Sequence, residues 1–481
     1  MAVRAYDTRP ENVEASRRLV ADQLRSAGLT SDSAAQLSER WVRLGDFLLT
    51  PDVVEADFIV GNPPYIRYDH LSTDLASSYR RAWPAMRGRG DIYVGFLERA
   101  LALLKPEGRV AYICPDRWMR NQYGSALRNV VSTAYSVEHV WIMHDVDAFD
   151  RRVAAYPALT VISRRPQGAV VVAETSADFG FAESRSLVEW ANAGALIEFE
   201  GRGVRAHQLP HWFEGVEPWP TGSPARLALI EHLNDNFSPL QDARTGTRVS
   251  IGVATGADGV YITTDPSVVE PDRVLPLATQ RDLMSGTFAW NRTYLINPWA
   301  DDGSLVDLRQ YPRLASYLGQ HATLRQRHVV KKNPDKWHRT IDKLRAGLLQ
   351  EPKILIHDLN ARMHPVLEPG GHYPHHNLYY ITSDAWDLRV LGGLLLSRVA
   401  QAFVEAYGVR MRGGTLRFQS QYLKRIRVPE PDAIPDEIKD ALRRAFESRD
   451  VDAATHAAAQ AYGIELLVYE LDRPAQPEQP L

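Results

Sequence analysis

The stretch Ala56-Asp57-Phe58-Ile59-Val60-Gly61-Asn62-Pro63-Pro64-Tyr65 joins an apolar segment to a stiff polar turn. The apolar residues 57–60 predict a buried strand that runs directly into the turn. Asn62 offers a carbonyl acceptor and an amide donor, and the two prolines fix the backbone behind it and remove two donors. Tyr65 adds a flat aromatic face. This combination after a strand suits the holding of a planar amino group for attack, and an ordinary proline-rich turn is the alternative.

Composition describes an ordinary globular chain whose 481 residues are enough for about two to four domains. Hydrophobic residues make up 44% and charged residues 24%, and the net charge is −3, so any nucleic-acid surface must be a local one. The single cysteine, Cys114, excludes a disulfide framework and a multi-thiolate zinc site. With no apolar run of membrane-spanning length and no signal peptide, the sequence predicts a cytoplasmic protein.

Strand and helix patterns alternate through residues 1–165. Strands are predicted at residues 2–6, 41–44, 57–60, 109–114, 137–143 and 158–162, and helices at 10–27, 31–39, 93–104 and 118–131. This alternation predicts an α/β fold with a mostly parallel sheet and helices on both faces. In such sheets ligands bind beyond the carboxyl ends of the strands. Because predicted strands end at Asp7, Asp46 and Asn62, we expect these three side chains at one edge.

Two of these acidic residues have the chemistry of a nucleoside site. A carboxylate that ends the second strand of such a fold can accept hydrogen bonds from both hydroxyls of a ribose, which is the role expected of Asp7. An acid followed by an aromatic, as in Asp46-Phe47, suits the exocyclic amine and the ring face of adenine. For each acid alone, a helix cap or a loop position is the alternative.

The tetrapeptide Asn62-Pro63-Pro64-Tyr65 resembles the catalytic motif of the gamma-class (TaqI-like and type IIG-like) DNA methyltransferases that modify the N6 of adenine. Residues 91–104 and 105–115 resemble the helix, turn and strand that follow this motif. The resemblance implies a doubly wound, Rossmann-like methyltransferase sheet, S-adenosylmethionine as cofactor and double-stranded DNA as substrate. It also implies that the target adenine flips out of the duplex, because the motif cannot reach N6 within the stack.

The resemblance assigns roles to individual residues. The side-chain carbonyl of Asn62 and the main-chain carbonyl of Pro63 would accept the two N6 hydrogens, Pro64 would keep the turn rigid, and Tyr65 would stack on the base. Asp7, Asp46 and Phe47 would bind the cofactor. An aromatic residue before the strand at 158–162 stacks on the flipped adenine in this family, which points to Phe149, with Tyr156 as the competing candidate.

One family feature is not found in residues 1–165. The family carries a Gly-rich turn after its first strand, which holds the methionine part of the cofactor, and no such turn follows a strand and opens a helix here. The nearest candidate, Gly88-Arg89-Gly90, follows no predicted strand. We therefore expect a sheet without its first strand, completed by an upstream segment or by a partner polypeptide, or else a chain that binds the cofactor weakly.

The remaining sequence predicts three further regions. Residues 166–245 are expected to form a connector, 246–430 an α+β target-recognition domain, and 431–481 C-terminal helices with a disordered Pro/Gln tail. Residues 249–262, Gln280-Arg281-Asp282-Leu283 and residues 413–429 resemble the recognition domain of TaqI-like methyltransferases. Residues 388–407 predict one apolar core helix.

The most basic stretch lies within residues 324–345, where basic residues are interleaved with Trp337. This pattern suits a phosphate backbone, and a solvated helical face is the alternative. The predicted DNA-binding residues are Arg325, Arg327, Lys331, Lys332, Lys336 and Arg339. His372, His375 and His376 cluster without an acid or a cysteine at metal-binding spacing, so we expect no metal site.

Three functions follow as hypotheses. The leading one is a site-specific adenine-N6 DNA methyltransferase of a restriction–modification or phage-defence system. The second is a DNA-binding modification subunit that is catalytically incomplete until another polypeptide joins it. The third is methylation of a protein glutamine, which uses the same tetrapeptide, but the basic C-terminal half argues against it.

Overall fold

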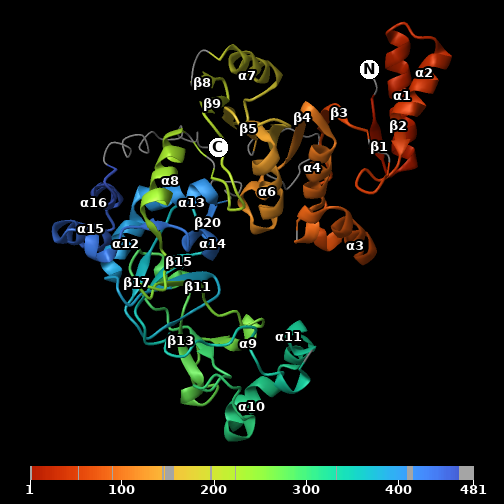
Figure 1. Ribbon diagram of the computed structural model, residues 1–481. Coiled ribbons are helices and arrows are strands. Elements are labelled where there is room, and N and C mark those ends of the chain that lie inside the picture. The colour runs from red at the N-terminus through yellow and green to blue at the C-terminus, as the bar shows by residue number, and fades with distance from the viewer. Residues whose placement is uncertain are drawn as a thin grey trace. The chain divides into compact units, whose positions relative to one another are not determined.

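The computed structural model describes residues 3–464 except 52–53, 89, 144–145, 147–156, 195–197, 221, 223, 332 and 409–414. The chain divides into two compact units, Met1–Pro220 and Thr221–Leu481 (Figure 1). The predicted Phe149 and Tyr156 and the C-terminal tail lie outside the described residues. Each unit is described by itself.

A seven-stranded mixed sheet forms the centre of the first unit. Its strands, in spatial order, are β3 (Ala56–Gly61), β4 (Leu104–Pro115), β6 (Pro157–Ser163), β5 (Ser136–Ile142), β7 (Val170–Thr175), β9 (Val204–Leu209) and β8 (Glu198–Gly201). The β3–β4 and β5–β7 pairs are parallel, and the other four pairs are antiparallel. The α/β class is confirmed, and the sheet resembles that of a methyltransferase.

Two expectations about this sheet are wrong. It is not mostly parallel, because β6 runs antiparallel between β4 and β5, and an apolar strand carries nothing in its residues that fixes its direction. Residues 158–162 are also not its last strand, since β7, β9 and β8 extend the sheet to Leu209. The hairpin of β8 and β9 turns at Gly203, whose φ of 66° favours glycine.

Seven α-helices belong to the described part of the first unit. They are α1 (Pro10–Ser26), α2 (Ser31–Trp41), α3 (Thr73–Ala82), α4 (Ile92–Ala102), α5 (Arg117–Arg120), α6 (Ser125–Ala134) and α7 (Phe181–Ala193). Among them, α1 and α2 pack on the separate pair of strands β1 (Ala5–Asp7) and β2 (Val42–Leu44). Helices α4 and α6 lie beside β4 and β5 (Figure 1) and share one core with Trp212 and Trp219. Cys114 is buried in the same core, and burial raises the pKa of its thiol to about 12.

The first two strands form a sheet of their own. β1 (Ala5–Asp7) and β2 (Val42–Leu44) pair in parallel, and β3 is the edge strand of the seven-stranded sheet. The strand expected at residues 57–60 is present, but the expectation that it is buried is wrong: β3 lies at the sheet edge, and its Phe58 and Val60 side chains are 72% and 79% exposed. Exposed apolar side chains on an edge strand form a surface that a further strand can cover.

Two four-stranded sheets organise the second unit. One has the order β11 (Arg248–Ile251), β19 (Leu378–Thr382), β15 (Lys353–His357) and β17 (Val366–Glu368). The other has the order β12 (Ile262–Thr263), β14 (Tyr294–Ile296), β13 (Val274–Ala278) and β18 (Tyr373–Pro374). Two small pairs join β10 (Ser238–Pro239) to β21 (Arg427–Val428) and β16 (Leu359–Asn360) to β20 (Leu416–Arg417).

The helices of this unit are α8 (Pro224–Asn236), α9 (Asp258–Tyr261), α10 (Pro312–Gly319), α11 (His328–Lys331), α12 (Leu388–Leu396), α13 (Arg398–Tyr407), α14 (Ser420–Leu423), α15 (Asp436–Ser448) and α16 (Val451–Tyr462). The single helix expected at 388–407 is wrong, because α12 and α13 meet at a 64° bend. The hydroxyl of Ser397 caps α13 by accepting from the Ala400 N–H, which starts a new helix there.

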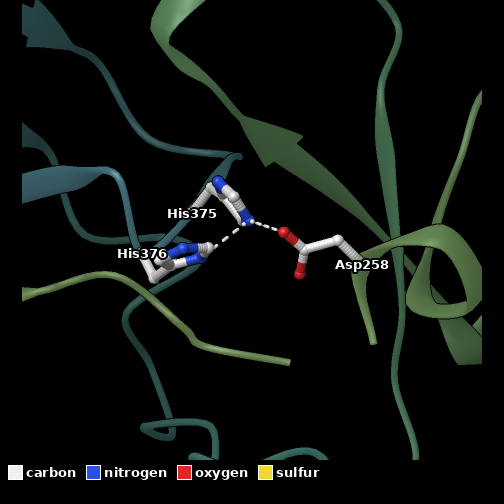
Figure 2. Close-up of side chains that lie close together, drawn as sticks. All are labelled: Asp258, His375 and His376. Atoms are coloured by element: carbon white, nitrogen blue, oxygen red, sulfur yellow. Dashed lines mark hydrogen bonds and ion pairs between the residues drawn. The ribbon is translucent and has the colours of Figure 1, made fainter. Parts of the chain in front are cut away.

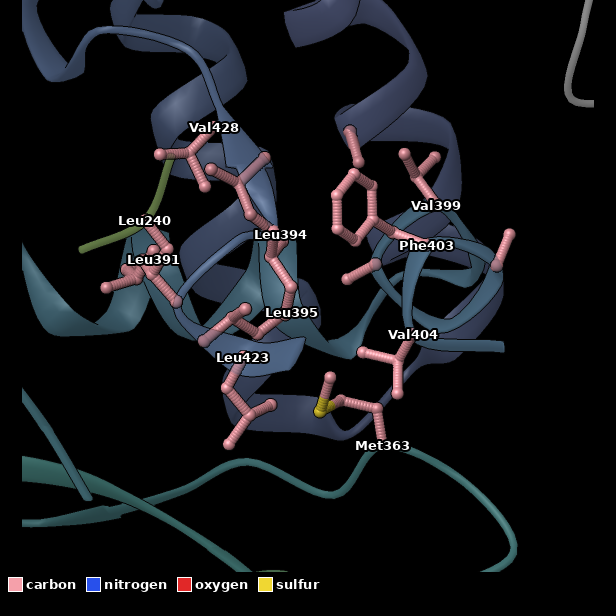
Figure 3. Close-up of a cluster of buried hydrophobic side chains, with 14 of the residues drawn as sticks. Leu240, Met363, Leu391, Leu394, Leu395, Val399, Phe403, Val404, Leu423 and Val428 are labelled. Carbon is pink, nitrogen blue, oxygen red and sulfur yellow. The ribbon is translucent and has the colours of Figure 1, made fainter. Parts of the chain in front are cut away.

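Helices α12 and α13 supply much of the core of the second unit, including Leu391, Leu394, Leu395, Phe403 and Val404 (Figure 3). In the described part of the chain, no single helix has the length and apolar composition to cross a membrane. The α12–α13 pair meets that test only as a bent pair, and its side chains are packed in this core.

His207 makes the first unit sensitive to acid. Its side chain is buried on β9, and burial lowers its pKa from 6.5 to about 4. The unfolded chain therefore binds a proton that the folded chain does not, and stability falls as the pH drops from about 6.5 to 4. The loss from this one group is on the order of 3 kcal/mol. His207→Gln should flatten this dependence.

The measurement is the urea midpoint of unfolding at about pH 7.5 and about pH 4.5. The matched control is His70→Gln, since His70 is exposed in the same unit and should keep the acid sensitivity of the unmodified chain. An equal acid-induced loss in His207→Gln and in the control would contradict this account.

Candidate active site

The stretch Asn62–Tyr65 lies where β3 ends, beside the end of β4. Gly61 pairs with Tyr112 of β4, and a Cβ on Gly61 would lie 3.2 Å from the Tyr112 ring, so glycine permits this close approach. Asn62 is exposed and Pro63 is buried. The half-buried Tyr65 donates its hydroxyl hydrogen bond to the Ile113 carbonyl at 2.9 Å. The turn is therefore anchored at both ends while the Asn62 side chain faces solvent.

The Tyr65 hydroxyl of this turn stays protonated at neutral pH. Burial raises the pKa of the Tyr65 hydroxyl far above its ordinary value, and Cys114 adds to the effect. In the described part of the chain no hydrogen bond engages the Asn62 amide. The amide oxygen can therefore accept hydrogen bonds from a ligand without first breaking a bond within the chain.

The start of α4 packs against the segment that follows the motif. The Ile92 N–H donates to the Ile66 carbonyl at 3.1 Å. Burial raises the pKa of the Asp91 carboxyl, while a hydrogen bond from the Tyr68 main chain and the charges of Arg117 and Arg67 oppose this effect. Asp91 was not among the predicted site residues. Its position at the N-cap of a helix that follows the motif is the feature that could have indicated it.

The structure brings Asp7 and Asp46 together at the ends of β1 and β2. Asp7 pairs with Leu44 in the parallel register, and the Gly45 N–H donates to the Asp7 carbonyl at 2.9 Å. The Asp46 carboxylate accepts from the Leu48 N–H at 2.8 Å and from the Tyr79 hydroxyl at 2.7 Å. The expectation that Asp7, Asp46 and Asn62 share one sheet edge is therefore wrong in part. Asp7 and Asp46 follow the paired strands β1 and β2, but Asn62 follows β3, which belongs to another sheet because β1 and β2 pair with each other and not with β3.

Asp7 also has a local structural role. Its carboxylate accepts from the Arg9 N–H at 2.8 Å and from the Asn12 side-chain amide at 3.2 Å, at the start of α1. Because Arg9 is the N-cap of α1 and no described side chain caps this helix, Asp7 is a loop acid, which is the second alternative raised by the sequence, and not a helix cap. A carboxylate has about four lone-pair sites, so these two bonds leave acceptor capacity for a ligand.

Phe47 lies in an aromatic cluster. Its ring centroid is 6.2 Å from that of Tyr6 and 5.3 Å from that of Phe96, and the Arg99 guanidinium lies 5.1 Å from it. Phe96 and Arg99 belong to α4. Helix α4 therefore contacts both the Asp46–Phe47 loop and, through Ile92, the segment after the Asn62 motif.

Some basic residues of the stretch 324–345 donate hydrogen bonds to carbonyls within the loop, whereas others are exposed. Arg327 donates to the carbonyls of Thr255, Trp337 and Arg339, and Arg339 donates to those of Thr340 and Ile341. These two arginines hold the loop together. Lys331 and Lys336 are exposed.

Arg325 is exposed as well, and its guanidinium lies 4.0 Å from the centre of the Trp337 ring. Lys332 lies outside the described residues. The alternative of one solvated helical face does not describe this stretch, since its described residues form short turns such as α11 and the 3-10 segments Ala322–Gln326 and Pro334–Lys336.

Comparison with known proteins places the chain in a family. Residues 33–149 match the family described as Eco57I restriction-modification methylase. The chain is 42% identical over 465 residues to the type II methyltransferase M.PaeR7I of Pseudomonas aeruginosa, covering 96% of this chain and 80% of that protein. It is 41% identical over 474 residues to M.XhoI of Xanthomonas vasicola, covering 96% and 85%.

A solved structure agrees with the fold. The type IIL restriction-modification enzyme MmeI, solved in complex with DNA, matches with a TM-score of 0.59 at 12% identity, over 91% of this chain and 61% of that one. At this identity the match concerns the fold alone. The identity with M.PaeR7I and M.XhoI extends over both units, and this chain belongs to the type II DNA methyltransferases of restriction–modification systems.

Proposed function

We propose that this methyltransferase transfers a methyl group to the N6 of adenine in duplex DNA, with Asn62, Pro63, Pro64 and Tyr65 as its catalytic turn. The observation that carries the proposal is the exposed amide of Asn62 on a turn that Tyr65 anchors to β4. The lone pair on N6 is delocalised into the ring, so the amine is a poor nucleophile until its geometry changes.

The turn favours the change in geometry at N6 because it binds the transition state more tightly than the ground state. The Asn62 side-chain carbonyl and the Pro63 main-chain carbonyl accept the two N6 hydrogens, and they do so best when the nitrogen becomes tetrahedral. Their hydrogen bonds are then stronger in the transition state than in the ground state, which is what accelerates a reaction. The buried Pro63 and the anchored Tyr65 keep both acceptors in place. The ring of Tyr65 stacks on the flipped base, with Phe149 as the proposed second stacking surface.

The residues at the ends of β1 and β2 fit S-adenosylmethionine, which supplies the methyl group when it is bound. Asp7 would accept from the ribose hydroxyls, and Asp46 and Phe47 would contact the adenine of the cofactor. Because Leu48 and Tyr79 already donate to Asp46, the carboxylate is held in a fixed orientation for this contact. The aromatic cluster around Phe47 fixes its ring in the same way.

A second candidate is a modification subunit that needs another polypeptide. The exposed Phe58 and Val60 on the edge strand β3 favour it, because a further strand there would cover them. Calorimetry with S-adenosylmethionine distinguishes the two candidates. Binding by this chain alone supports the self-sufficient enzyme, whereas binding that needs an added polypeptide supports the subunit.

The exposed cations of the basic stretch provide a proposed contact with the DNA backbone. The double variant Lys331→Ala/Lys336→Ala should weaken DNA binding for every sequence alike, because phosphate contacts carry no base information. The slope of log affinity against log salt should become shallower by about 0.9 for each phosphate that the protein no longer neutralises. Fluorescence anisotropy over a salt series measures both quantities.

The matched control is Arg362→Ala/Arg444→Ala, which removes two other exposed cations of the same unit. The control should keep the slope of the unmodified chain. A salt slope that is unchanged in Lys331→Ala/Lys336→Ala would remove these lysines from the proposed interface.

The proposed function as a whole is tested with S-adenosylmethionine labelled on its methyl group, offered together with duplex DNA and with a mixture of proteins. Label that accumulates in DNA supports the proposal. Label that accumulates in protein would instead support the glutamine alternative.

A further inference from the structure

Three side chains of the types that bind metal ions meet in the second unit. Among the described residues, Asp258, His375 and His376 form the one group of three or more His, Cys, Asp or Glu whose ligand atoms all lie within 4.8 Å of one another. Figure 2 shows the three side chains converging from two separate segments. His375 and His376 were noted in the sequence, but Asp258 lies 117 positions before His375.

The distances in this cluster are close to those around a metal ion. His375 Nε2 lies 3.2 Å from Asp258 Oδ2 and 2.9 Å from His376 Nδ1. Zinc is bound tetrahedrally by imidazole and carboxylate at about 2.0–2.2 Å, which sets neighbouring ligand atoms about 3.3 Å apart. These two distances are therefore within a few tenths of an ångström of those around a zinc ion, and the third pair of ligand atoms lies within 4.8 Å.

Hydrogen bonds alone cannot give every donor and acceptor atom of this cluster a suitable partner. One ring nitrogen of His375 faces both a carboxylate oxygen and a second ring nitrogen. If it carries a proton, that proton is shared between two acceptors, and if it carries none, it faces the carboxylate as a second acceptor. A divalent cation accepts a lone pair from each of the three atoms at once.

The surrounding contacts orient the cluster as outer contacts orient metal ligands. The buried Thr255 donates its hydroxyl hydrogen bond to Asp258 Oδ1 at 2.5 Å, which leaves Oδ2 for the site. The backbone of the two histidines is fixed, since their N–H groups donate to the carbonyls of Ala278 and Val253 at 3.0 and 3.1 Å.

The same cluster is open to solvent on one side. His376 is exposed and the Asp258 side chain is 44% exposed, so a water or an outside ligand could complete the coordination.

We propose that Asp258, His375 and His376 bind one divalent transition-metal ion of the zinc class. Two imidazole nitrogens with one carboxylate favour such an ion over Mg²⁺ or Ca²⁺, which prefer oxygen ligands. The ion would tie the start of α9 to the segment between β18 and β19. This proposal does not depend on the proposed catalytic function.

The test uses the untagged full chain, stripped with a chelator and titrated with ZnCl₂ by calorimetry, with MgCl₂ as the comparison. We expect one zinc ion per chain, a rise in the thermal unfolding midpoint with zinc, and no rise with magnesium. His376→Ala and Asp258→Asn should each lower zinc affinity on the order of 100-fold and remove the thermal shift.

The matched control is His456→Ala, which removes an exposed histidine of the same unit and should bind zinc as the unmodified chain does. Circular dichroism of each variant without metal verifies that it is folded, and His376→Ala changes an exposed side chain. Absence of zinc binding by the unmodified chain, or equal zinc affinity in His376→Ala and His456→Ala, would overturn the proposal.

Discussion

Replacing Asn62 by alanine should lower the rate of methyl transfer by about 10²–10³-fold, because one preorganised acceptor of the transition state is removed. The fold should remain intact, since the Asn62 side chain is exposed and bonded to nothing in the described part of the chain. DNA binding should remain close to that of the unmodified chain, because the exposed cations of the basic stretch lie in the other unit. Single-turnover methylation of a DNA duplex measures the chemical step apart from binding.

Two variants sharpen this expectation. Asn129→Ala removes an exposed asparagine from α6 of the same unit and should leave the rate unchanged. Asn62→Asp keeps one acceptor oxygen but adds a negative charge, so it should retain part of the rate while binding DNA less tightly at low salt. A full rate in Asn62→Ala would remove Asn62 from the catalytic assignment.

The variant Lys353→Met should lower the free energy of unfolding by about 3–5 kcal/mol, because it leaves a buried carboxylate without its cation. Lys353 and Glu368 are fully buried and face one another across β15 and β17, with Nζ 2.5 Å from Oε2. The other oxygen of Glu368 accepts from the Gly370 N–H and bonds to His372 Nδ1. The Gly370 N–H carries no net charge that could replace the charge of the lysine.

The pair can be tested by removing both charges together. Lys353→Met/Glu368→Leu should recover most of the stability that the single variant loses, since no uncompensated charge then remains in the core. Lys105→Met is the contrasting control, because its partner Asp57 is exposed and surface pairs contribute about 0–1 kcal/mol. Urea unfolding measures all four chains. A single variant as stable as the unmodified chain, or a double variant no better than the single one, would contradict this explanation.

The local features of the first unit could be predicted from the sequence because they depend on neighbours in the chain. The strand at residues 57–60, its polar turn and the acids that end β1 and β2 follow from alternating patterns and from turn residues. The parallel pairing of β1 with β2 then places Asp7 beside Gly45 and Asp46, as the geometry of parallel sheets requires.

The direction of a strand and the contacts between residues distant in the sequence could not be predicted. Nothing in residues 158–162 states that β6 runs antiparallel between β4 and β5. The break between α12 and α13 lies at Ser397, whose side chain caps α13 in the middle of a stretch with the apolar pattern of one helix. Asp258 reaches His375 only through the folding of the second unit, so spacing along the chain gave no indication of the cluster.

The central claim is that the Asn62–Tyr65 turn methylates the exocyclic amine of adenine. Its most direct test is nucleoside analysis by mass spectrometry of duplex DNA incubated with S-adenosylmethionine and the chain, together with any polypeptide that the calorimetry shows to be required. The account predicts N6-methyladenine as the product, formed by the unmodified chain and by Asn129→Ala but absent with Asn62→Ala. Methylated cytosine as the product, or N6-methyladenine formed equally by Asn62→Ala, would contradict it.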